Sequence, residues 1–427
     1  MEIVKIKKGK IFGTISPPPS KSQTLRALIF AMLAKGKSTI YNFLPSFDTY
    51  AMLDVLKAYG IKTHVFKDRI EIIGSGGKIN PPNDIINAQN SGIILRFIGA
   101  IAALNNTFSI ITGDESIKKN RVILPLLIGL KQLNVYAESL NQDNRPPIIV
   151  KGPIKPNKIR VSGEDSQPIS ALLIATAFSA GPTDIFVENP GEKPWVALTL
   201  SWFDFFNIKY SNENFSHYRV EGNAQIKGFE KHIEPDFSSL TFLIVAALIT
   251  NSEITINNFD LNNQGGDKQF ITCLQNLGAN FAIDETAKTL TIKKGSKLKD
   301  AKIDVNDFID ALPILAVLGC FVLGKTHLYN AKIARNKESD RIAAISEELK
   351  KMGAKITELE DGMIIEKSTL KGAKVFSHFD HRIAMSLCVA ALNASGETII
   401  ENTSCIKKSY PSFFEDLKNL KAQIEIS

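Results

Sequence analysis

The feature of this sequence that most limits its fold is an internal repeat of about 70 residues that occurs six times. Six strongly apolar segments with helical periodicity begin at polar residues, which are Ser22, Ser91, Ser166, Ser238, Asp310 and Asp380. Because these segments are apolar on almost every side, we expect them to form buried helices.

A second set of six segments follows the same period, and these segments are amphipathic. Each ends in a turn residue followed by a strand pattern, and the turn residues are Gly60, Asn134, Asn207, Gly278, Gly353 and Lys421. Gly and Asn tolerate the left-handed conformation that often ends a helix, whereas Lys421 departs from this preference. The two markers together predict six units, each with two helices and several strands.

The repeat also predicts the domain organisation. A 70-residue unit is too large for a solenoid, whose repeats have about 20–45 residues. A chain of 427 residues favours two or three domains. We therefore expect two domains of three units each. Three consecutive prolines at residues 17–19 mark one boundary, and the polar segment 221–234 marks a crossover between domains.

Composition excludes several classes of protein. Hydrophobic residues make up 44% and charged residues 22%, as in ordinary globular proteins. The longest apolar stretch, residues 313–324, is too short for a membrane-spanning helix, which needs roughly 20 residues. The first 20 residues lack the apolar core of a signal peptide. We expect a cytoplasmic protein with no membrane partner.

The charge and the spacing of the histidines and cysteines exclude further classes of binding site. The net charge of +7 suits an anionic ligand, but no nucleic-acid-binding motif accompanies it. The six histidines show no metal-ligand spacing, and the four cysteines form no CxxC pair. We therefore expect no metal site, and reduced, mostly buried thiols.

Additional polar groups gather at the starts of the apolar helices. They are found in residues 19–22 with Arg26, residues 90–92, residues 165–167, Asp310 and residues 380–382. Repeats related by symmetry would aim these helix starts toward one surface of each domain. Free N–H groups and the partial positive charge of several helix starts would form an anion-binding site there. Capping alone explains a single polar start, but not the accompanying charges.

Charged clusters also precede the amphipathic helices. Residues 113–116 are followed by Lys118, Lys119 and Arg121, and residues 335–341 carry five charged side chains. On a helix, Lys337 and Arg341 would share one face. A solvated surface explains the segment 335–341 taken alone. When this segment is considered together with the polar helix starts, an anion-binding face is favoured.

Read in chain order, these motifs resemble the 5-enolpyruvylshikimate-3-phosphate synthase family, the 3-phosphoshikimate 1-carboxyvinyltransferases. The resemblance rests on PSKS at residue 19, NSG at 90, GDES at 113, DSQ at 165, DALP at 310, KESDR at 337, DHRIAM at 380 and KSYP at 408. No single motif is decisive, but their order and spacing are specific and cover nearly the whole chain.

The resemblance implies a fold of the α/β (α+β) class. It consists of two similar domains, each with three βαββαβ-type units around buried helices, an inverse α/β barrel with the ligand cleft between the domains. In the family the N-terminal strand returns to the C-terminal domain. We therefore expect residues 1–18 and 232–427 to form one domain and residues 19–231 the other.

The resemblance also implies a reaction. The enolpyruvyl group of phosphoenolpyruvate is transferred to the 5-hydroxyl of shikimate 3-phosphate, and phosphate is released by addition and elimination through a tetrahedral intermediate. This step belongs to the shikimate pathway of aromatic amino-acid biosynthesis. No cofactor and no macromolecular partner are implied, and the family expectation is a monomer. The two substrates carry a combined charge of roughly −5 to −6.

Site residues follow from the motifs by resemblance. The implied catalytic residues are Asp310, as base for the 5-hydroxyl, and Glu338 with Lys21, for proton transfer at carbon C3. Phosphoenolpyruvate contacts are Lys21, Gly92, Arg121, Gln167, Arg341, Arg382 and Lys408. Shikimate 3-phosphate contacts are Lys21, Ser22, Arg26, Asp165, Ser166, Gln167, Asp310 and Lys337. His381 either touches substrate or is structural.

The sequence departs from the family pattern at several of these positions. Asp165 stands where the first Ser of Ser-Ser-Gln is usual, which puts a phosphate contact in doubt. Residues 192–195, Glu-Lys-Pro-Trp, replace Ser-x-Pro-Tyr, so a Ser hydroxyl contact is lost while Trp195 keeps a ring for stacking. An extra residue precedes Arg121. Ile93 and Phe97 are larger than usual, which predicts weaker binding of glyphosate, the inhibitor that competes with phosphoenolpyruvate.

Three other functions compete with this one. UDP-N-acetylglucosamine enolpyruvyl transferases share the fold and the donor but use a loop Cys, and residues 105–125 contain none. A catalytically dead binding protein on the same scaffold would not need the acidic and basic residues Lys21, Asp310, Glu338, Arg341 and Lys408. A nucleic-acid-binding module fits the positive charge but not the acidic site residues.

Overall fold

A computed structural model describes residues 2–261 and 267–427. The chain folds into two compact units. Unit 1 comprises Met1–Pro18 and Pro235–Ser427, and unit 2 comprises Pro19–Glu234. Each unit has its own continuous hydrophobic core.

Each unit contains three four-stranded sheets of one common design among the described residues. In every sheet one edge strand is parallel to its neighbour and the other pairs are antiparallel. The six sheets correspond to the six sequence repeats. This arrangement confirms the fold class that the repeat and the resemblance predicted.

The first sheet of unit 2 has the strand order β14 (Glu230–His232), β3 (Lys35–Tyr41), β5 (Arg69–Ser75) and β4 (Lys62–Val65). The second has the order β6 (Ile86–Asn87), β7 (Ser109–Thr112), β9 (Ile148–Lys151) and β8 (Tyr136–Ser139). The third has the order β10 (Lys158–Ser162), β11 (Thr183–Glu188), β13 (His217–Val220) and β12 (Tyr210–Glu213). The first sheet of unit 1 has the strand order β16 (Phe281–Asp284), β17 (Thr289–Ile292), β15 (Ile254–Ile256) and β2 (Gly13–Ile15). The second has the order β18 (Lys302–Asp304), β19 (Lys325–Tyr329), β21 (Gly362–Glu366) and β20 (Lys355–Leu359). The third has the order β22 (Lys374–Phe376), β23 (Glu397–Glu401), β1 (Ile3–Lys7) and β24 (Ile424–Ile426).

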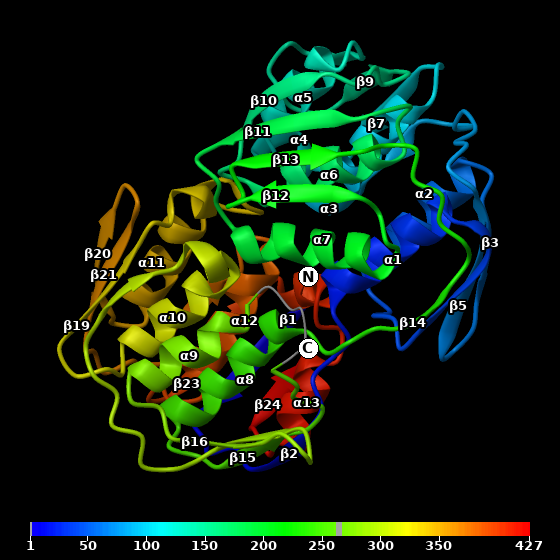
Figure 1. Ribbon diagram of the computed structural model, residues 1–427. Coiled ribbons are helices and arrows are strands. Elements are labelled where there is room, and N and C mark those ends of the chain that lie inside the picture. Colours follow the sequence, from blue (N-terminus) through cyan, green and yellow to red (C-terminus); the bar gives the residue numbers. More distant parts are fainter. Residues whose placement is uncertain (1, 262–266) are drawn as a thin grey trace. The chain divides into compact units, whose positions relative to one another are not determined.

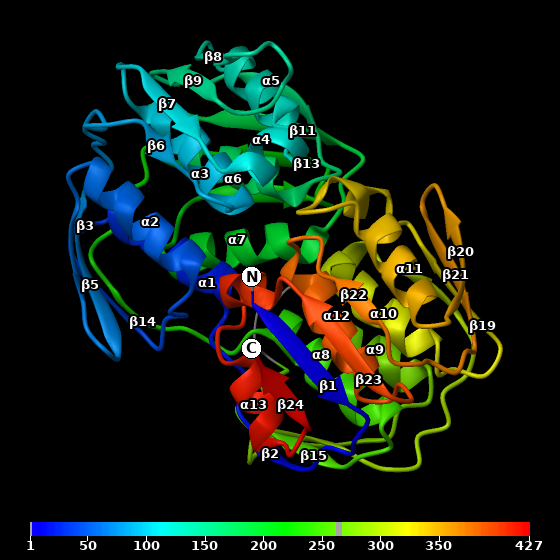
Figure 2. The ribbon, with the colours of Figure 1, turned by 180° about the vertical axis from the view of Figure 1, so that it is seen from behind.

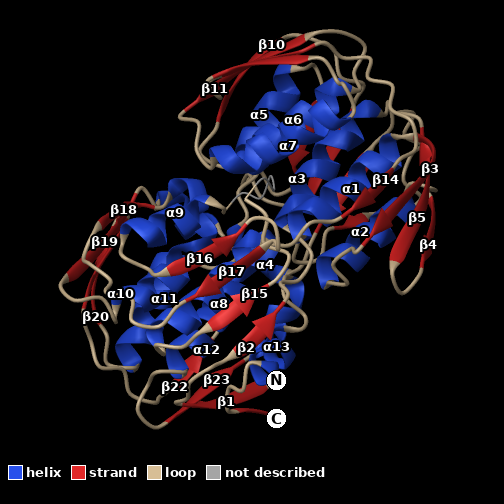
Figure 3. Ribbon diagram, turned by 60° about the horizontal axis from the view of Figure 1, so that its bottom comes forward, coloured by secondary structure: helices blue, strands red, loops and turns tan. Residues whose placement is uncertain are grey.

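The N-terminal strands complete sheets of unit 1. Strand β1 lies between β23 and β24, antiparallel to both, and is the blue strand beside the red ones in Figure 2. Strand β2 is parallel to β15 and forms the edge of the sheet visible in Figure 3. Strand β14, the last strand of unit 2, pairs with β3. The chain therefore leaves unit 1 after β2 and returns to it after β14.

The apolar segments form the buried helices that their periodicity predicted. They are α1 (Lys21–Leu33), α3 (Gly92–Ile101), α6 (Ser166–Ala177), α8 (Phe237–Ile249), α10 (Leu312–Gly319) and α12 (His381–Ala391). Nearly every residue of these helices is buried. In unit 1, α8, α10 and α12 contact one another at the centre of the core (Figure 1).

The amphipathic segments form α2 (Phe47–Ala58), α5 (Leu124–Gln132), α7 (Lys193–Phe205), α9 (Gln269–Asn276), α11 (Arg341–Lys351) and α13 (Phe413–Asn419). All six turn residues after these helices adopt a positive φ, including Lys421 at 70°. The residue type of Lys421 departs from the pattern, but its backbone conformation does not. The remaining helical segments are α4 (Glu115–Asn120) and the 3₁₀ turns Ala102–Leu104, Asn306–Ala311, Lys332–Asn336 and Thr403–Lys408.

Four of the six apolar helices are not capped by the polar residue at which their start was expected. Helix α1 is capped by Ser20, not Ser22, α6 by Asp165, not Ser166, and α8 by Asp236, not Ser238. In each case the earlier side chain accepts a hydrogen bond from a backbone N–H in the first turn. Asp310 caps no helix, because it lies in a 3₁₀ turn before α10, and Pro313 occupies the first turn of that helix.

Among the described residues, none of the helices combines the length and hydrophobicity needed to cross a bilayer. Cys320 and Cys388 are buried free thiols, as predicted, and Cys273 and Cys405 are free and partly buried.

Candidate active site

Arg341 is the centre of a buried ion-pair network in unit 1. As the first residue of α11 it donates to Asp310 at 2.7 Å, to Glu338 at 2.8 Å and to Asp380 at 2.8 Å. Burial alone would lower the pKa of Arg341, but the three carboxylates raise it well above its ordinary value. Arg341 is therefore a permanent cation whose orientation is set by three acids.

Asp310 lies between two arginines. Its Oδ1 accepts from Arg341, and its Oδ2 accepts from Arg382 at 3.1 Å. Burial would raise the pKa of Asp310, but Arg382, Arg341 and Lys337 together hold it well below its ordinary value. The side chain is ionised, as a proton acceptor must be, and its two oxygens are occupied by guanidinium groups.

Glu338 shares its carboxylate between two cations of unit 1. One oxygen accepts from Arg341, and the other accepts from Lys408 Nζ at 2.7 Å. Lys408 comes from the 3₁₀ turn after β23. We call Asp310, Glu338, Arg341, Asp380, Arg382 and Lys408 the Arg341 cluster. Lys337 and His381 are also buried, and His381 Nδ1 lies 3.8 Å from Asp380.

The expectation that Lys337 and Arg341 share one helix face is wrong. Asp340 caps α11 by accepting from Ala343 N, so the helix begins at Arg341. Lys337 follows the preceding 3₁₀ turn and has a non-helical backbone. Its positive charge still helps to lower the pKa of Asp310.

A buried carboxyl group that the sequence did not reveal lies beside the Arg341 cluster. Asp267 accepts a short hydrogen bond from the Ser238 hydroxyl, and Arg382 donates to the Ser238 carbonyl at 3.1 Å. Burial and the charge of Asp310 raise the pKa of Asp267 to about 7, although Arg382 opposes the shift. Asp267 precedes α9 in a glycine-rich segment, and no motif recognised in the sequence includes it.

In unit 2, three helix starts converge on Asp48. Lys21, the first residue of α1, lies 3.8 Å from the Asp48 carboxylate at the start of α2. Ser91, which caps α3, donates to the same carboxylate at 3.0 Å. Within unit 2 the fold therefore places the polar helix starts of two sequence repeats next to one another, around an acid that the motifs did not identify.

A second group in unit 2 surrounds Gly92. Arg96 donates to Gln167 at 3.2 Å and pairs with Asp165 at 3.0 Å. A Cβ atom on Gly92 would lie 3.1 Å from Arg96, 3.2 Å from Gln167 and 3.7 Å from Arg121. The structure thus brings together three predicted residues, Gly92, Arg121 and Gln167. Arg96 was not assigned a role, because a lone arginine in an apolar helix has no distinctive pattern.

Arg26 is buried without a carboxylate partner among the described residues. It donates to the Thr199 hydroxyl at 3.0 Å and to the carbonyls of Ser22 and Trp195 at 3.2 and 3.1 Å. Burial lowers the pKa of Arg26 to about 9. Its guanidinium lies over the fully buried Phe97 ring, 5.2 Å from the ring centre. We call Ser22, Arg26, Trp195 and Thr199 the Arg26 cluster.

Ser166, at the start of α6, is occupied by a carboxylate of the chain itself. Its backbone N–H donates to Glu192 at 2.9 Å, and its hydroxyl donates to the same oxygen at 3.0 Å. Asp165 caps the helix by accepting from Gln167 N at 3.0 Å. Asp165 and Glu192 are two positions at which the sequence departs from the family pattern.

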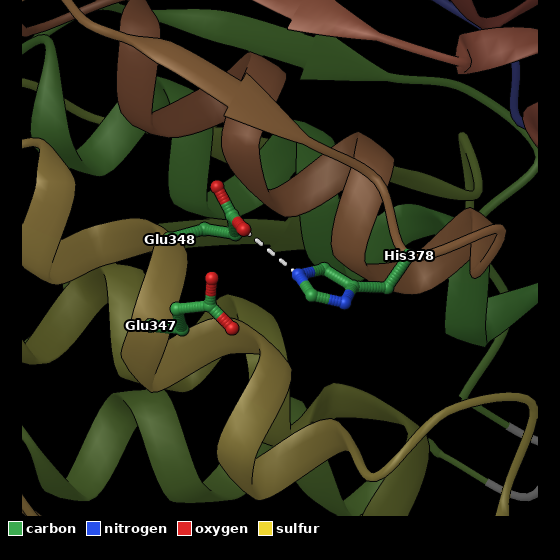
Figure 4. A group of neighbouring side chains, drawn as sticks. All are labelled: Glu347, Glu348 and His378. Atoms are coloured by element: carbon green, nitrogen blue, oxygen red, sulfur yellow. Dashed lines mark hydrogen bonds and ion pairs between the residues drawn. The ribbon is translucent and has the colours of Figure 1, made fainter.

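A further acidic group lies near the start of α12 and is shown in Figure 4. Glu347, Glu348 and His378 have potential ligand atoms within 4.8 Å of one another. However, the Lys351 ammonium already lies 2.9 Å from Glu347 and 2.8 Å from Glu348. A metal ion would have to displace that ammonium group.

Glu348 anchors the segment that leads to Asp380. It accepts from Phe376 N at 3.0 Å and contacts His378 Nε2 at 2.8 Å. Burial would raise the pKa of Glu348, but the bonds to His378 and Lys351 lower it. His378 and Phe379 both have a positive φ, which non-glycine residues seldom adopt. Glu348 therefore fixes a strained turn just before the Arg341 cluster.

Comparison with known proteins agrees with these motifs and this fold. The family profile of EPSP synthase (3-phosphoshikimate 1-carboxyvinyltransferase) matches residues 6–417. A 3-phosphoshikimate 1-carboxyvinyltransferase of Chlamydia caviae is 41% identical over 423 residues, covering 99% of this chain and 94% of the relative. One of Methanocaldococcus jannaschii is 40% identical and covers 98% of both chains.

Solved structures give the same result. The EPSP synthase of Acinetobacter baumannii has a TM-score of 0.83 and 26% sequence identity, with both chains fully covered. The profile spans nearly the whole chain, and the relatives match both units. The chain belongs to the EPSP synthase (3-phosphoshikimate 1-carboxyvinyltransferase) family.

Proposed function

We propose that this enzyme transfers the enolpyruvyl group of phosphoenolpyruvate to the 5-hydroxyl of shikimate 3-phosphate and releases phosphate. The observation that carries the mechanism is the position of Asp310 between Arg341 and Arg382. A carboxylate held by two guanidinium groups is ionised but a weak base. Its basicity therefore depends on whether these arginines have another anion to bind.

Substrate binding supplies that anion. Phosphoenolpyruvate carries a carboxylate and a phosphate, which prefer the planar donors of arginine. When Arg341 and Arg382 bind the substrate, they donate less to Asp310, and the pKa of Asp310 rises. Asp310 then accepts the proton of the 5-hydroxyl as that oxygen attacks carbon C2 of phosphoenolpyruvate.

The other proton transfers are assigned to Glu338 and Lys21. Carbon C3 gains a proton in the addition step, which gives the tetrahedral intermediate. It loses a proton in the elimination step, as the phosphate group leaves. Glu338 accepts hydrogen bonds from Arg341 and Lys408, so an anion that binds these two cations also weakens their hold on Glu338. Lys21 beside Asp48 is the second candidate for this exchange.

Most of the acceptor contacts that we propose belong to unit 2. Arg26 is a buried cation with no carboxylate partner in the described parts of the chain, so an anionic ligand there gains a full charge-assisted interaction. Such a bond is worth about 1.5–3 kcal/mol. Lys21, Ser22, Ser166 and Gln167 are the further acceptor contacts that we propose. Lys337 is assigned to the same substrate.

Phosphate release from phosphoenolpyruvate tests this function. The assay uses shikimate 3-phosphate and, in parallel, UDP-N-acetylglucosamine as acceptors, with wild type and Asp310→Asn. We expect release only with shikimate 3-phosphate and a loss of about 10²–10⁴-fold in kcat for the variant. Release with neither acceptor from folded protein would reject the enzymatic function and favour a binding protein.

A further inference from the structure

The N-terminus of α6 is an anion-binding position that the chain itself occupies. A helix start offers N–H groups and a partial positive charge to any anion. Here the Ser166 N–H and hydroxyl both donate to Glu192, and Gln167 N donates to Asp165. Two carboxylates of unit 2 thus fill the position that an anionic ligand would take.

Glu192 belongs to the segment before α7, although its side chain lies at the start of α6. It precedes α7, yet it makes no side-chain cap to that helix. Its side chain crosses instead to α6 and is 2% exposed. Its backbone has φ 46°, in the left-handed region that costs a non-glycine residue about 1–3 kcal/mol. The contact with Ser166 is therefore maintained against backbone strain.

The same donors cannot serve Glu192 and a phosphate together. Ser166 has one N–H and one O–H, and both donate to a single Glu192 oxygen. A phosphate brought to Ser166 would also meet the negative charge of that carboxylate at close range, where like charges repel strongly. Glu192 must therefore leave Ser166 before a phosphate can bind there.

We propose that Glu192 is a specificity-determining residue, a resident anion that the phosphate of the acceptor must displace from Ser166. This inference rests on the proposed function, in which Ser166 contacts shikimate 3-phosphate. It predicts that Glu192 lowers the preference of the enzyme for shikimate 3-phosphate over shikimate below the preference that the hydrogen-bond donors of α6 would otherwise give. Removing the charge of Glu192 then strengthens binding of shikimate 3-phosphate.

The test compares wild type, Glu192→Gln and Glu192→Asn by calorimetric titration with shikimate 3-phosphate and with shikimate. Gln keeps the shape and removes the charge. Asn tolerates the left-handed backbone but is too short to reach Ser166. Glu188→Gln is the matched control, because Glu188 lies four residues earlier and is exposed. Melting temperatures verify that each variant is folded.

We expect both Glu192 variants to bind shikimate 3-phosphate about tenfold or more tightly than wild type, the effect of one charge-assisted contact. Affinity for shikimate should stay the same, and Glu188→Gln should match wild type. Unchanged or weaker binding of shikimate 3-phosphate, or an equal gain for shikimate, would overturn the proposal. Because titration needs no turnover, it decides about Glu192 even if the phosphate-release assay rejects the proposed reaction.

Discussion

Two buried arginines, one in each unit, are equally hidden from solvent but have opposite electrostatic environments. Arg341 donates to three carboxylates, and its pKa is raised. Arg26 donates to one hydroxyl and two backbone carbonyls, and its pKa is lowered to about 9. Carboxylates of the chain compensate the charge of Arg341, whereas no carboxylate in residues 2–261 and 267–427 pairs with Arg26.

This difference indicates different roles. A compensated arginine is held in one orientation and controls the acids around it, as a proton-transfer site requires. An uncompensated arginine gains most from an incoming anion, as a binding site requires. The Arg341 cluster is therefore the proposed centre of proton transfer, and the Arg26 cluster is the proposed contact for the acceptor phosphate.

The largest effect is expected from Arg341→Met. The substitution leaves Asp310, Glu338 and Asp380 without their shared cation, and breaking one buried pair already costs about 3–5 kcal/mol. We expect a loss of at least that size in the free energy of unfolding, measured with urea, and no detectable activity. Lys325→Met is the control, because its pair with Glu366 is exposed and solvent screening leaves it little effect on stability. Equal losses for both variants would reject the compensated network.

Arg26→Met should separate binding from stability. The three broken hydrogen bonds lower stability, but the loss of a buried charge that no described carboxylate compensates offsets part of this cost, so we expect a net loss of only about 1–2 kcal/mol. The Kd for shikimate 3-phosphate should rise about tenfold or more. A stability loss as large as that of Arg341→Met would show that the two arginines are not different in kind.

Asp267→Asn should change how stability depends on pH. The folded pKa of Asp267, about 7, lies above the ordinary value of 3.8, so the folded state holds this proton more tightly than the unfolded state. Between about pH 4 and pH 7 the wild type therefore loses about 1.4 kcal/mol per pH unit from this group. The variant lacks this loss.

The measurement for Asp267 is the melting temperature at pH 5 and pH 8. The difference between Asp267→Asn and wild type should shift in favour of the variant as pH rises, while the exposed Asp300→Asn should show no such shift. The pH dependence that Asp310 contributes has the opposite sign. Its pKa is lowered in the folded state, so its stabilising contribution disappears as pH falls. A constant difference for Asp267→Asn would show that Asp267 is ionised throughout.

Gly92→Ala should have the smallest effect on stability. The added methyl group meets only the ends of the Arg96 and Gln167 side chains, which can move by a few tenths of an ångström. We expect less than about 1 kcal/mol of change in unfolding free energy, partly offset by the better helix propensity of Ala. The KM for phosphoenolpyruvate should rise severalfold while that for shikimate 3-phosphate does not. Equal rises would indicate a general distortion of unit 2.

Much of the fold could be predicted because each repeat has the same periodic pattern of hydrophobic residues. The buried helices and the turn residues, such as Asn134, follow from local patterns that tertiary contacts reinforce. Helix starts were less certain, because several polar residues at each start compete for the cap. At α8, Asp236 and Ser238 both suit that position.

The candidate site could be predicted only where motifs mark it. Asp48, Arg96, Asp267 and Glu348 contribute through side-chain contacts with residues far away in the sequence, which no spacing along one helix reveals. The position of Lys337 was mistaken because a cap at Asp340 interrupts the expected helix. Charge compensation, which separates Arg26 from Arg341, is a property of the folded chain and not of a motif.

The most direct test of this division of roles is a paired titration and turnover experiment on Arg26→Met and Asp310→Asn. Each variant is titrated with shikimate 3-phosphate and then assayed for phosphate release. The account predicts that Arg26→Met loses about tenfold or more in affinity, whereas Asp310→Asn binds within about fivefold of wild type but releases almost no phosphate. The reverse pattern, with binding lost in Asp310→Asn and kept in Arg26→Met, would contradict it.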